Sequence, residues 1–498
     1  MAGPRAAQDA LLKDFRPYAW LAALVFVLYA RCLNFGLIYL DDNIFLQKQF
    51  DFLADWRNFS VLFRKDAFIG TSGHFYRPLL ISTFMVDAHL WGGAVGLWHA
   101  SNIVFHAASC ALVFRILSRF CKRAPAFLLA AAFAAHPALS SAMAWVCGRT
   151  DTVFALWALG SFHCFQLFLE SGKPRWALAH LALLAGAFLT KELAIVVSLA
   201  CLSYSVLVDN RPTPAFWRRL ILAGWAAELG AWGVIRKIVL HPQSDYSVPG
   251  GARSVLAGLP ALLVYWGKTL LPLNLSPYPI LPDSPYAWGA AAVVIAALAF
   301  LRIKPTQRPT ALWGLLWFVL FLAPSFVYPD KHIQPVLYEY RLYLPLLGAL
   351  VFFSRVDFIA EFDLRRGSRA AAAGLLLSAL AALSWTNESS YRDAFSAWRR
   401  AAVYSPDSAV VHSQLGLAYV MEKDYSHAEA EYSNCIALEP EMRGAHSNLG
   451  AVYMNEGRWE DAREQFHLDL EANPGDYDTL RNLGLALRAL REKSSQKK

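Results

Sequence analysis

The sequence carries little charge for its length. Asp, Glu, Lys and Arg make up 17% of its 498 residues, whereas an ordinary soluble chain has about a quarter. Apolar residues account for 56% and aromatic residues for 14%. A fold in water could not bury this much apolar surface, so the composition indicates a membrane protein.

The sequence also lacks cysteine pairs. Its seven cysteines are scattered, no two of them form a Cys-x-x-Cys pair, and Cys32, Cys110, Cys164 and Cys201 lie inside apolar runs. This spacing favours neither a zinc site nor a disulfide framework, and packing within or between helices is the simpler interpretation.

A continuous basic stripe is missing as well. The formal net charge is +8, but the basic residues form short clusters between apolar runs, which argues against a nucleic-acid partner. The clusters fall in alternate loops, and the positive-inside rule places those loops, with the N-terminus, in the cytoplasm. They are Arg5, Lys13 and Arg16; Arg115, Arg119, Lys122 and Arg123; Lys173 and Arg175; Arg211, Arg218 and Arg219; Arg302, Lys304 and Arg308; and Arg365, Arg366 and Arg369.

What the sequence does contain is a series of long apolar runs, of the length that a bilayer-spanning helix requires. We expect an all-α bundle of about eleven membrane helices, the first of them a retained anchor. Residues 37–98 are expected to form a first outer loop that does not span, and the Pro-rich stretch 250–285 a re-entrant or interfacial excursion. The predicted spans are 17–36, 99–117, 125–138, 152–169, 176–190, 193–208, 217–235, 286–302, 311–327, 342–354 and 371–386.

The C-terminal region is repetitive. With an odd number of spans starting inside, everything after about residue 388 lies outside. A tetratricopeptide pattern with a period of 34 residues appears there, and it predicts an α-solenoid. The matching positions are Leu415, Gly416, Tyr419, Ala428, Tyr432 and Pro440 in one copy, and Leu449, Gly450, Tyr453, Ala462, Phe466 and Pro474 in the next. We therefore predict a membrane domain over 1–388, a repeat domain over 389–492 and a basic tail over 493–498.

Ionisable residues gather at the predicted outer ends of the helices, where the bilayer makes them costly unless they have a use. One shared outer cavity would allow cations to hold an anionic phosphate while a carboxylate accepts a proton from an attacking hydroxyl. The candidates are Asp41, Asp42, Arg77, His99, His136, Arg149, Asp151, Lys191, Glu192, Glu339 and Arg341.

Structural interpretations of the same residues remain open. Asp41 and Asp42 are also typical of a solvated turn or a helix cap, and His99 is typical of a hydrogen bond between helices. Lys191 could pair with its neighbour Glu192, and Arg149 with Asp151.

In this order, the motifs resemble the transmembrane and tetratricopeptide-repeat O-mannosyltransferases and their bacterial relatives, within the GT-C superfamily. One departure is that Tyr340 separates Glu339 from Arg341, whereas the family tends to place an acid and an arginine side by side. The segments that carry the resemblance are Tyr39-Leu40-Asp41-Asp42-Asn43-Ile44, Tyr76-Arg77-Pro78-Leu79, His99 with Asn102 and His106, Ala135-His136-Pro137, Gly148-Arg149-Thr150-Asp151, Thr190-Lys191-Glu192, Leu271-Pro272-Leu273-Asn274-Leu275-Ser276 and Leu342-Tyr343-Leu344-Pro345.

The resemblance implies a glycosyltransferase that takes a sugar, mannose being one candidate, from a polyprenyl-phosphate carrier to a hydroxyl acceptor. Its base would be a carboxylate of the first outer loop, Asp42 ahead of Asp41. Arg149, Lys191 and Arg341 would hold the donor phosphate. A divalent metal, Mg²⁺ or Mn²⁺, is an optional cofactor, and the repeats would engage an acceptor protein or glycan.

Two other functions compete with this one. A membrane scaffold would use the repeats to recruit proteins and the helices only as an anchor. A transporter of lipid-linked glycans would place ionisable residues near the bilayer midplane and show inverted repeats, and neither feature is found. The expected location is a bacterial inner membrane with the repeats in the periplasm, or the endoplasmic reticulum with the repeats in the lumen.

Overall fold

The computed structural model describes residues 12–69, 75–211, 214–240, 248–326, 336–363 and 367–496, with the side chains of 248–254, Ala257 and Gln496 left out. Within these ranges the chain forms helices and no strands, which confirms the all-α prediction. It divides into two compact units, one of residues 1–275 and 285–392 and another of residues 276–284 and 393–498. The sequence alone suggested a boundary at residue 388. The N-terminus, predicted to be cytoplasmic, and the predicted basic tail lie partly outside the described residues.

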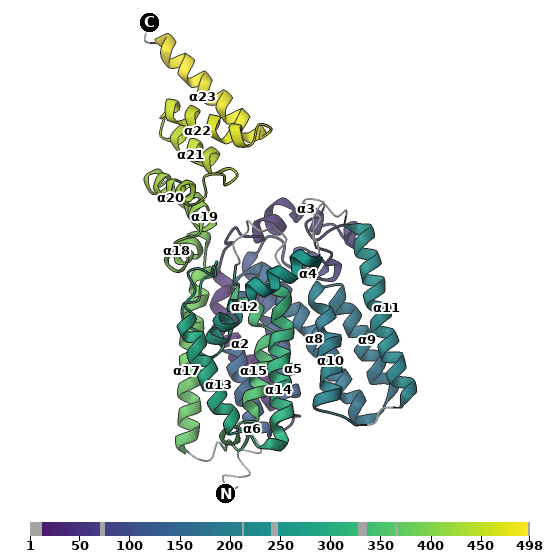
Figure 1. The fold of residues 1–498 in the computed structure, drawn as a ribbon. Coiled ribbons are helices and arrows are strands. Elements are labelled where there is room, and N and C mark those ends of the chain that lie inside the picture. The colour runs from purple at the N-terminus through teal and green to yellow at the C-terminus, as the bar shows by residue number, and fades with distance from the viewer. Residues whose placement is uncertain are drawn as a thin grey trace. The chain divides into compact units, whose positions relative to one another are not determined.

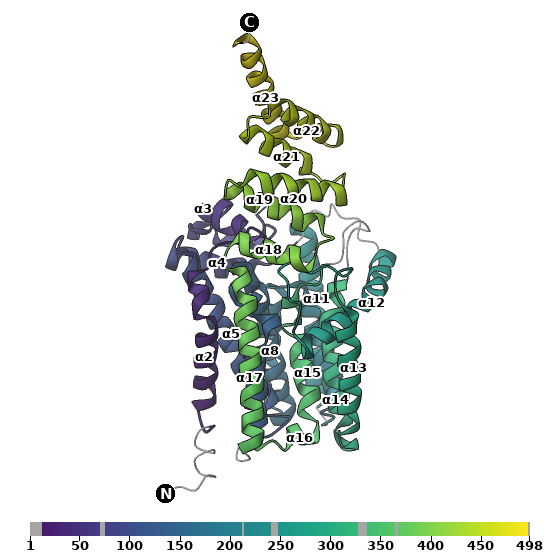
Figure 2. The same cartoon turned by 90° about the vertical axis from the view of Figure 1, so that its left-hand side faces the viewer.

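The first unit is a bundle of helices (Figure 1). In both views α2, α5, α8, α15 and α17 run roughly side by side (Figure 2). Its α-helices are α2 (Arg16–Tyr29), α3 (Phe50–Leu53), α4 (Pro78–Trp91), α5 (Val95–Leu117), α6 (Arg123–Ala134), α7 (Ser141–Ala144), α8 (Arg149–Ser171), α9 (Pro174–Phe188), α10 (Ile195–Leu207), α11 (Ala215–Val239), α12 (Val248–Leu270), α13 (Tyr286–Leu301), α14 (Arg308–Leu322), α15 (Pro345–Ser354), α16 (Asp357–Ala360) and α17 (Gly367–Glu388).

Short helical turns connect these helices and shape the loops between them. They are η1 (Ala30–Asn34), η2 (Ile44–Lys48), η3 (Trp56–Phe63), η4 (Pro137–Leu139), η5 (Val146–Gly148), η6 (Glu192–Ala194), η7 (Pro305–Gln307), η8 (Ala323–Phe326), η9 (Glu339–Leu342) and η10 (Ser389–Tyr391).

A helix occupies each of the eleven predicted spans, but by length and composition fewer helices in the described ranges could cross a membrane. Five qualify, and a sixth does if α6 and Pro137–Ala144, bent by 50°, count as one span. The count of eleven therefore stays a prediction. The five are Arg16–Asn34, Val95–Leu117, Val146–Ser171, Pro305–Phe326 and Gly367–Tyr391.

One stretch differs from the expected irregular excursion. Residues 248–270 form the regular helix α12 in spite of Pro260 in its interior, and only the chain after Leu270 is irregular. A proline removes one backbone donor, and hydrogen bonds on either side of it can still sustain a helix in a packed bundle. The prediction gave the prolines of 250–285 too much weight at its start.

Close helix contacts in the bundle rely on small residues. A β-carbon added at Gly314 would lie 2.6 Å from the carbonyl oxygen of Gly348, and one added at Gly348 would lie 2.3 Å from that of Gly314. The backbones of α14 and α15 thus touch, a form of packing that membrane helices use because lipid provides no hydrophobic drive for their association. The contact holds α15 against α14, and α15 directly follows η9, one of the elements around the cavity described below.

The second unit consists of α18 (Ala394–Tyr404), α19 (Ala409–Met421), α20 (Tyr425–Leu438), α21 (Ala445–Asn455), α22 (Trp459–Ala472) and α23 (Tyr477–Gln496). Residues 276–284 belong to it because the ring of Tyr278 lies 5.9 Å from that of Trp398, and the carbonyl of Tyr278 accepts a hydrogen bond from the hydroxyl of Ser405 at 2.8 Å.

Equivalent residues pack the successive helix pairs of this unit. A β-carbon at Gly416 of α19 would lie 3.0 Å from the ring of Tyr432 in α20, and one at Gly450 of α21 would lie 2.7 Å from the ring of Phe466 in α22. Both contacts are 34 residues apart in the sequence, so the repeat has a physical counterpart in packing. The name tetratricopeptide solenoid stays a prediction.

Candidate functional site: a charged cavity in the membrane unit

The first unit encloses a cavity of about 550 Å³. Its walls come from the loop after η1, the chain before and within α4, the start of α8, the link from α9 to η6, and the segments around η8 and η9. The lining residues are Leu40, Asp41, Phe45, Ala67, Phe68, Phe75, Arg77, Leu80, Ile81, Phe84, Trp145, Cys147, Thr150, Asp151, Lys191, Glu192, Leu193, Pro324, Ser325, Tyr338, Tyr340 and Arg341.

The two neighbouring aspartates of the first loop have different surroundings. Asp42 is 1% exposed, and its two carboxylate oxygens accept the backbone N–H groups of Ile38 at 2.7 Å and Asn43 at 3.1 Å. Asp41 lines the cavity. Successive side chains on a short irregular loop diverge, so Asp42 braces the loop while Asp41 faces the space where a substrate would sit.

Burial and one cation set the protonation of these carboxyl groups. Burial raises the pKa of Asp42 to about 6, although the backbone N–H groups around it oppose the shift. Burial also raises the pKa of Asp41, and nearby Arg77 counteracts that shift. Asp41 thus combines access to the cavity with a basicity above that of an ordinary aspartate, two properties that a general base needs.

Two ion pairs bridge the cavity walls. Lys191 Nζ lies 2.7 Å from Asp151 Oδ1, and Arg77 Nη2 lies 2.8 Å from Glu192 Oε2. Lys191 has an extended backbone, with φ −156° and ψ 141°, so its side chain and that of Glu192 diverge. The pairing of Lys191 with Glu192 is therefore wrong, and so is that of Arg149 with Asp151.

Arg341 is the third cation of the cavity. Its Nη1 donates to the carbonyl oxygens of Val336 at 2.9 Å and Ser325 at 3.2 Å, and its guanidinium lies against the ring of Tyr338. These contacts hold the side chain in the wall between η8 and η9. Tyr340 and Arg341 line the cavity, whereas Glu339, which Tyr340 separates from Arg341 in the sequence, does not.

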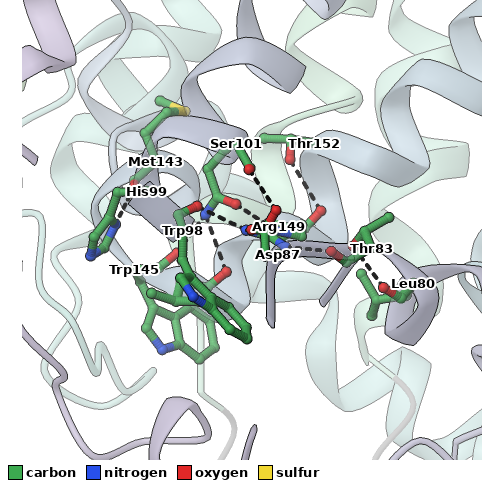
Figure 3. A network of polar contacts seen from close by, with 12 residues as sticks. Leu80, Thr83, Asp87, Trp98, His99, Ser101, Met143, Trp145, Arg149 and Thr152 are labelled. Carbon is green, nitrogen blue, oxygen red and sulfur yellow. Dashed lines mark hydrogen bonds and ion pairs between the residues drawn. The ribbon is translucent and has the colours of Figure 1, made fainter. Parts of the chain in front are cut away.

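Arg149 does not line the cavity and is fully buried. Figure 3 shows it at the centre of a network of polar contacts. Its Nη2 donates to Asp87 and to the carbonyl of Trp98, its Nε to Asn102 Oδ1 at 2.8 Å, and its Nη1 to the carbonyl of Thr83 at 3.2 Å. The guanidinium therefore joins α4, α5 and α8 by satisfied hydrogen bonds. In this position it supports the wall formed by α4, and its predicted contact with a donor phosphate stays a prediction.

The remaining candidates are also buried away from the cavity. The Nδ1 atom of His99 lies 2.9 Å from the carbonyl of Met143, and the Nε2 atom of His136 lies 3.1 Å from that of Thr269. The carboxylate of Glu339 pairs with Lys268 at 2.6 Å, and both side chains are nearly inaccessible. These residues tie loops to helices around the cavity.

Two kinds of residue at and around the cavity do not stand out in the sequence. Asp87 and Lys268, the partners of Arg149 and Glu339, were not selected, although Asp87 is the one Asp, Glu, Lys or Arg residue of helix α4 and a buried charge needs a partner. The aromatic side of the cavity was not predicted either, because the candidate residues were selected for their charge. That side comprises Phe45, Phe68, Phe75, Phe84, Trp145, Tyr338 and Tyr340.

A metal site is not apparent in the parts of the chain that the structure describes: no three His, Cys, Asp or Glu side chains there are grouped to hold an ion. Asp41, Asp151 and Glu192 line the same cavity, yet Asp151 and Glu192 are each engaged by a cation. The use of Mg²⁺ or Mn²⁺ stays a prediction.

Comparison with known proteins finds similarity to one family over part of the chain. Residues 98–227 match the family described as dolichyl-phosphate-mannose-protein mannosyltransferase. The chain is 33% identical over 198 residues to protein O-mannosyl-transferase Tmtc2 of Drosophila melanogaster, and this match covers 37% of this chain and 21% of that protein. It is 31% identical over 197 residues to Tmtc1 of the same species, covering 38% and 22%, and 37% identical over 151 residues to TMTC4 of Homo sapiens, covering 26% and 20%.

The chain thus matches about a fifth of the length of these curated relatives. The matched family region begins in α5 and ends in α11, and it contains Asp151, Lys191 and Glu192 of the cavity. These matches agree with the resemblance seen in the motifs: over part of its length, the chain is similar to the Tmtc protein O-mannosyl-transferases.

Proposed function

We propose that the chain is a glycosyltransferase that moves a sugar, mannose in the first instance, from a polyprenyl phosphate to a hydroxyl group of a protein. The observation that carries the proposal is the cavity in which an accessible carboxylate, Asp41, shares the walls with Arg77, Lys191 and Arg341. The names of the relatives and of the matching family, which mention protein O-mannosylation and dolichyl phosphate mannose, support the choice of donor and acceptor.

In this mechanism the acceptor hydroxyl attacks the anomeric carbon of the donor. The new bond joins the acceptor oxygen to that carbon, and the bond from the carbon to the phosphate oxygen breaks with its electron pair going to the phosphate. Asp41 accepts the hydroxyl proton. General-base catalysis of this kind contributes about 10² to 10⁴ in rate.

The cations have the complementary task of stabilising the leaving phosphate. Among the described lining residues, the negative charges of Asp41, Asp151 and Glu192 balance the positive charges of Arg77, Lys191 and Arg341. A donor phosphodiester adds one negative charge, and the product monoester carries about one more. The proton taken up by Asp41 offsets that further charge, so the total charge within the cavity stays nearly constant during transfer.

The aromatic side suits a sugar and the first isoprene unit of a lipid carrier. Phe45 stacks on Phe84 with ring centroids 4.9 Å apart, and Phe68 lies 5.5 Å from Phe45. Apolar faces of this kind pack against the C–H face of a hexose and against lipid, whereas the cations lie where a phosphate would link the two. We infer that the cavity opens on the non-cytoplasmic side, as the alternating basic clusters suggest, and that the C-terminal helical unit engages the acceptor.

The test is transfer by the purified chain in liposomes that contain dolichyl phosphate mannose or its undecaprenyl counterpart, labelled in the sugar. We expect labelled mannose on a Ser/Thr-rich acceptor protein and an equal amount of free polyprenyl phosphate. A scaffold would leave the donor intact, and a lipid-glycan transporter would move the donor between leaflets without cleaving it. Either result contradicts the proposal.

A further inference from the structure

The C-terminal end of α17 is joined to the chain that leads into the first loop. The guanidinium Nε of Arg31, in η1, donates to Glu388 Oε1 at the end of α17, and the thiol of Cys32 lies 3.7 Å from Glu388 Oε2. The guanidinium of Arg31 also lies 4.6 Å from the ring of Trp385. The side chain of Glu388 is fully buried and that of Arg31 is 25% exposed.

A second contact follows five residues after Arg31 and four residues after Glu388. The backbone N–H of Gly36 donates to the carbonyl oxygen of Arg392 at 2.8 Å. Together with the Arg31–Glu388 pair, this hydrogen bond ties residues 31–36 to residues 388–392 at two points.

The tied segment leads directly to the two aspartates. After Gly36 the chain turns back on itself, since the N–H of Ile38 donates to Asp42, and Tyr39 has a φ of 59°. A non-glycine residue in this left-handed region is held there by its surroundings. The fixed point at Gly36 is thus the start of a short strained loop whose next residues are Leu40 and Asp41.

Neither Arg31 nor Glu388 lines the cavity, so contact with substrate does not account for this buried charge pair. Simple helix anchoring is the alternative explanation, because polar pairs also join membrane helices that have no catalytic task. The two explanations differ in what they predict for the loop and for the rate of transfer.

We propose that Arg31 and Glu388 are positioning residues which, with the Gly36–Arg392 hydrogen bond, form a clamp that holds Asp41 at the cavity. The role in transfer rests on the function proposed above. General-base catalysis depends on geometry, and displacement of a reacting group by about 1 Å can cost about 100-fold in rate. The clamp acts on the base and not on the cations, so it influences turnover more than donor binding.

The sharpest variant is Gly36→Pro, because proline lacks the N–H that donates to Arg392. Phe35, the residue before it, has φ −86° and ψ 148°, a conformation that a following proline favours. Gly36→Ala is the matched control, since it keeps the N–H and its β-carbon would lie 3.7 Å from the Arg392 oxygen, an ordinary contact. Glu388→Gln weakens the other end of the clamp while preserving the shape of the side chain.

Two measurements are made on full-length protein in liposomes, for the wild type and all three variants. Hydrogen exchange of the peptide covering residues 36–44 reports the order of the loop without requiring activity. Mannose transfer reports kcat and KM for the donor. We expect Gly36→Pro to exchange faster in this peptide and to lose tenfold or more in kcat, with its KM within twofold of the wild-type value. Glu388→Gln should show the same pattern more weakly. Gly36→Ala should match the wild type.

The outcomes separate this proposal from the proposed function. If the wild type transfers mannose and folded Gly36→Pro keeps its kcat, the clamp does not position the base. If exchange of residues 36–44 is the same in all variants, the clamp does not exist. If exchange rises in Gly36→Pro but the wild type transfers no sugar, the clamp holds the loop and the proposed function fails.

Discussion

The two units of this chain use charge in opposite ways. In the membrane unit, several charged side chains are buried and pair across long stretches of sequence, as Arg149 does with Asp87 and Lys268 with Glu339. In the C-terminal unit they are exposed and pair mostly along one helix, as Arg458 does with Asp461 and Arg488 with Glu492. In apolar surroundings a lone charge is costly, so each is matched with a distant partner, whereas in water the partner matters little.

The largest effect is expected within the membrane unit, where the two adjacent aspartates Asp41 and Asp42 can be compared. Asp41→Asn removes the proposed base and keeps the size of the side chain, so we expect kcat to fall by about 10² to 10⁴. Because the pKa of Asp41 is raised, the wild-type rate should fall, as the pH is lowered, at a higher pH than an ordinary aspartate would give. Mannose transfer across a pH series measures both effects.

Asp42→Asn is the internal comparison, since Asp42 accepts two backbone N–H groups and does not reach the cavity. We expect it to disturb the order of the first loop, seen in hydrogen exchange, and to retain part of the activity. If Asp42→Asn abolishes transfer in a protein with an ordered loop while Asp41→Asn remains active, the assignment is reversed.

A second prediction compares a buried arginine with an exposed one. Arg149→Ala leaves Asp87 buried without its cation and should destabilise the membrane unit by about 3 to 5 kcal/mol. Arg458→Ala removes an exposed pair and should change stability by less than about 1 kcal/mol. Thermal unfolding in detergent measures the stability of both variants, and hydrogen exchange of peptides from each unit shows which unit is destabilised. Equal effects would show that burial does not govern these pairs.

A third prediction concerns a cation inside the cavity. Lys191→Ala removes a charge proposed to contact the donor phosphate, and a charge-assisted hydrogen bond contributes about 1.5 to 3 kcal/mol. We expect polyprenyl phosphate to bind at least tenfold more weakly, with kcat falling as well. Lys304→Ala is the control, because Lys304 is half exposed and pairs with Asp357 and Glu361 away from the cavity. If Lys191→Ala binds polyprenyl phosphate as tightly as the wild type, Lys191 does not contact the donor phosphate.

The smallest expected effect lies in the C-terminal unit. His412 Nδ1 lies 2.6 Å from Glu431, and this hydrogen bond raises the pKa of His412. A raised pKa in the folded state stabilises α19 and α20 below the unfolded value of about 6.5, and the contribution is lost as the pH rises through the raised pKa.

The same position 34 residues later supplies the comparison, because His446 there faces Gln465 at 2.8 Å and no carboxylate. Hydrogen exchange of α19 in the full chain should therefore quicken above neutral pH more than that of α21. Glu431→Gln should abolish the difference. A pH response of α19 that survives in Glu431→Gln would come from another group.

The sequence predicted the positions of the helices because apolar runs and a 34-residue period are local or regular signals. It predicted one shared cavity, and the structure brings Asp41, Arg77, Asp151, Lys191, Glu192 and Arg341 to a single one. It did not identify which candidates turn away from that space. Arg149 and Glu339 stand beside cavity residues in the sequence, and only the partners Asp87 and Lys268, on other helices, determine that they point elsewhere.

The hydrogen bond between Gly36 and Arg392 joins two main-chain atoms. Every amino acid offers a carbonyl at position 392, and every one except proline offers an N–H at position 36. Residue identity at both ends is therefore free to drift during evolution while the contact persists. A comparison of homologous sequences would show no invariant pair here, and the one visible trace would be the absence of proline at the position of Gly36.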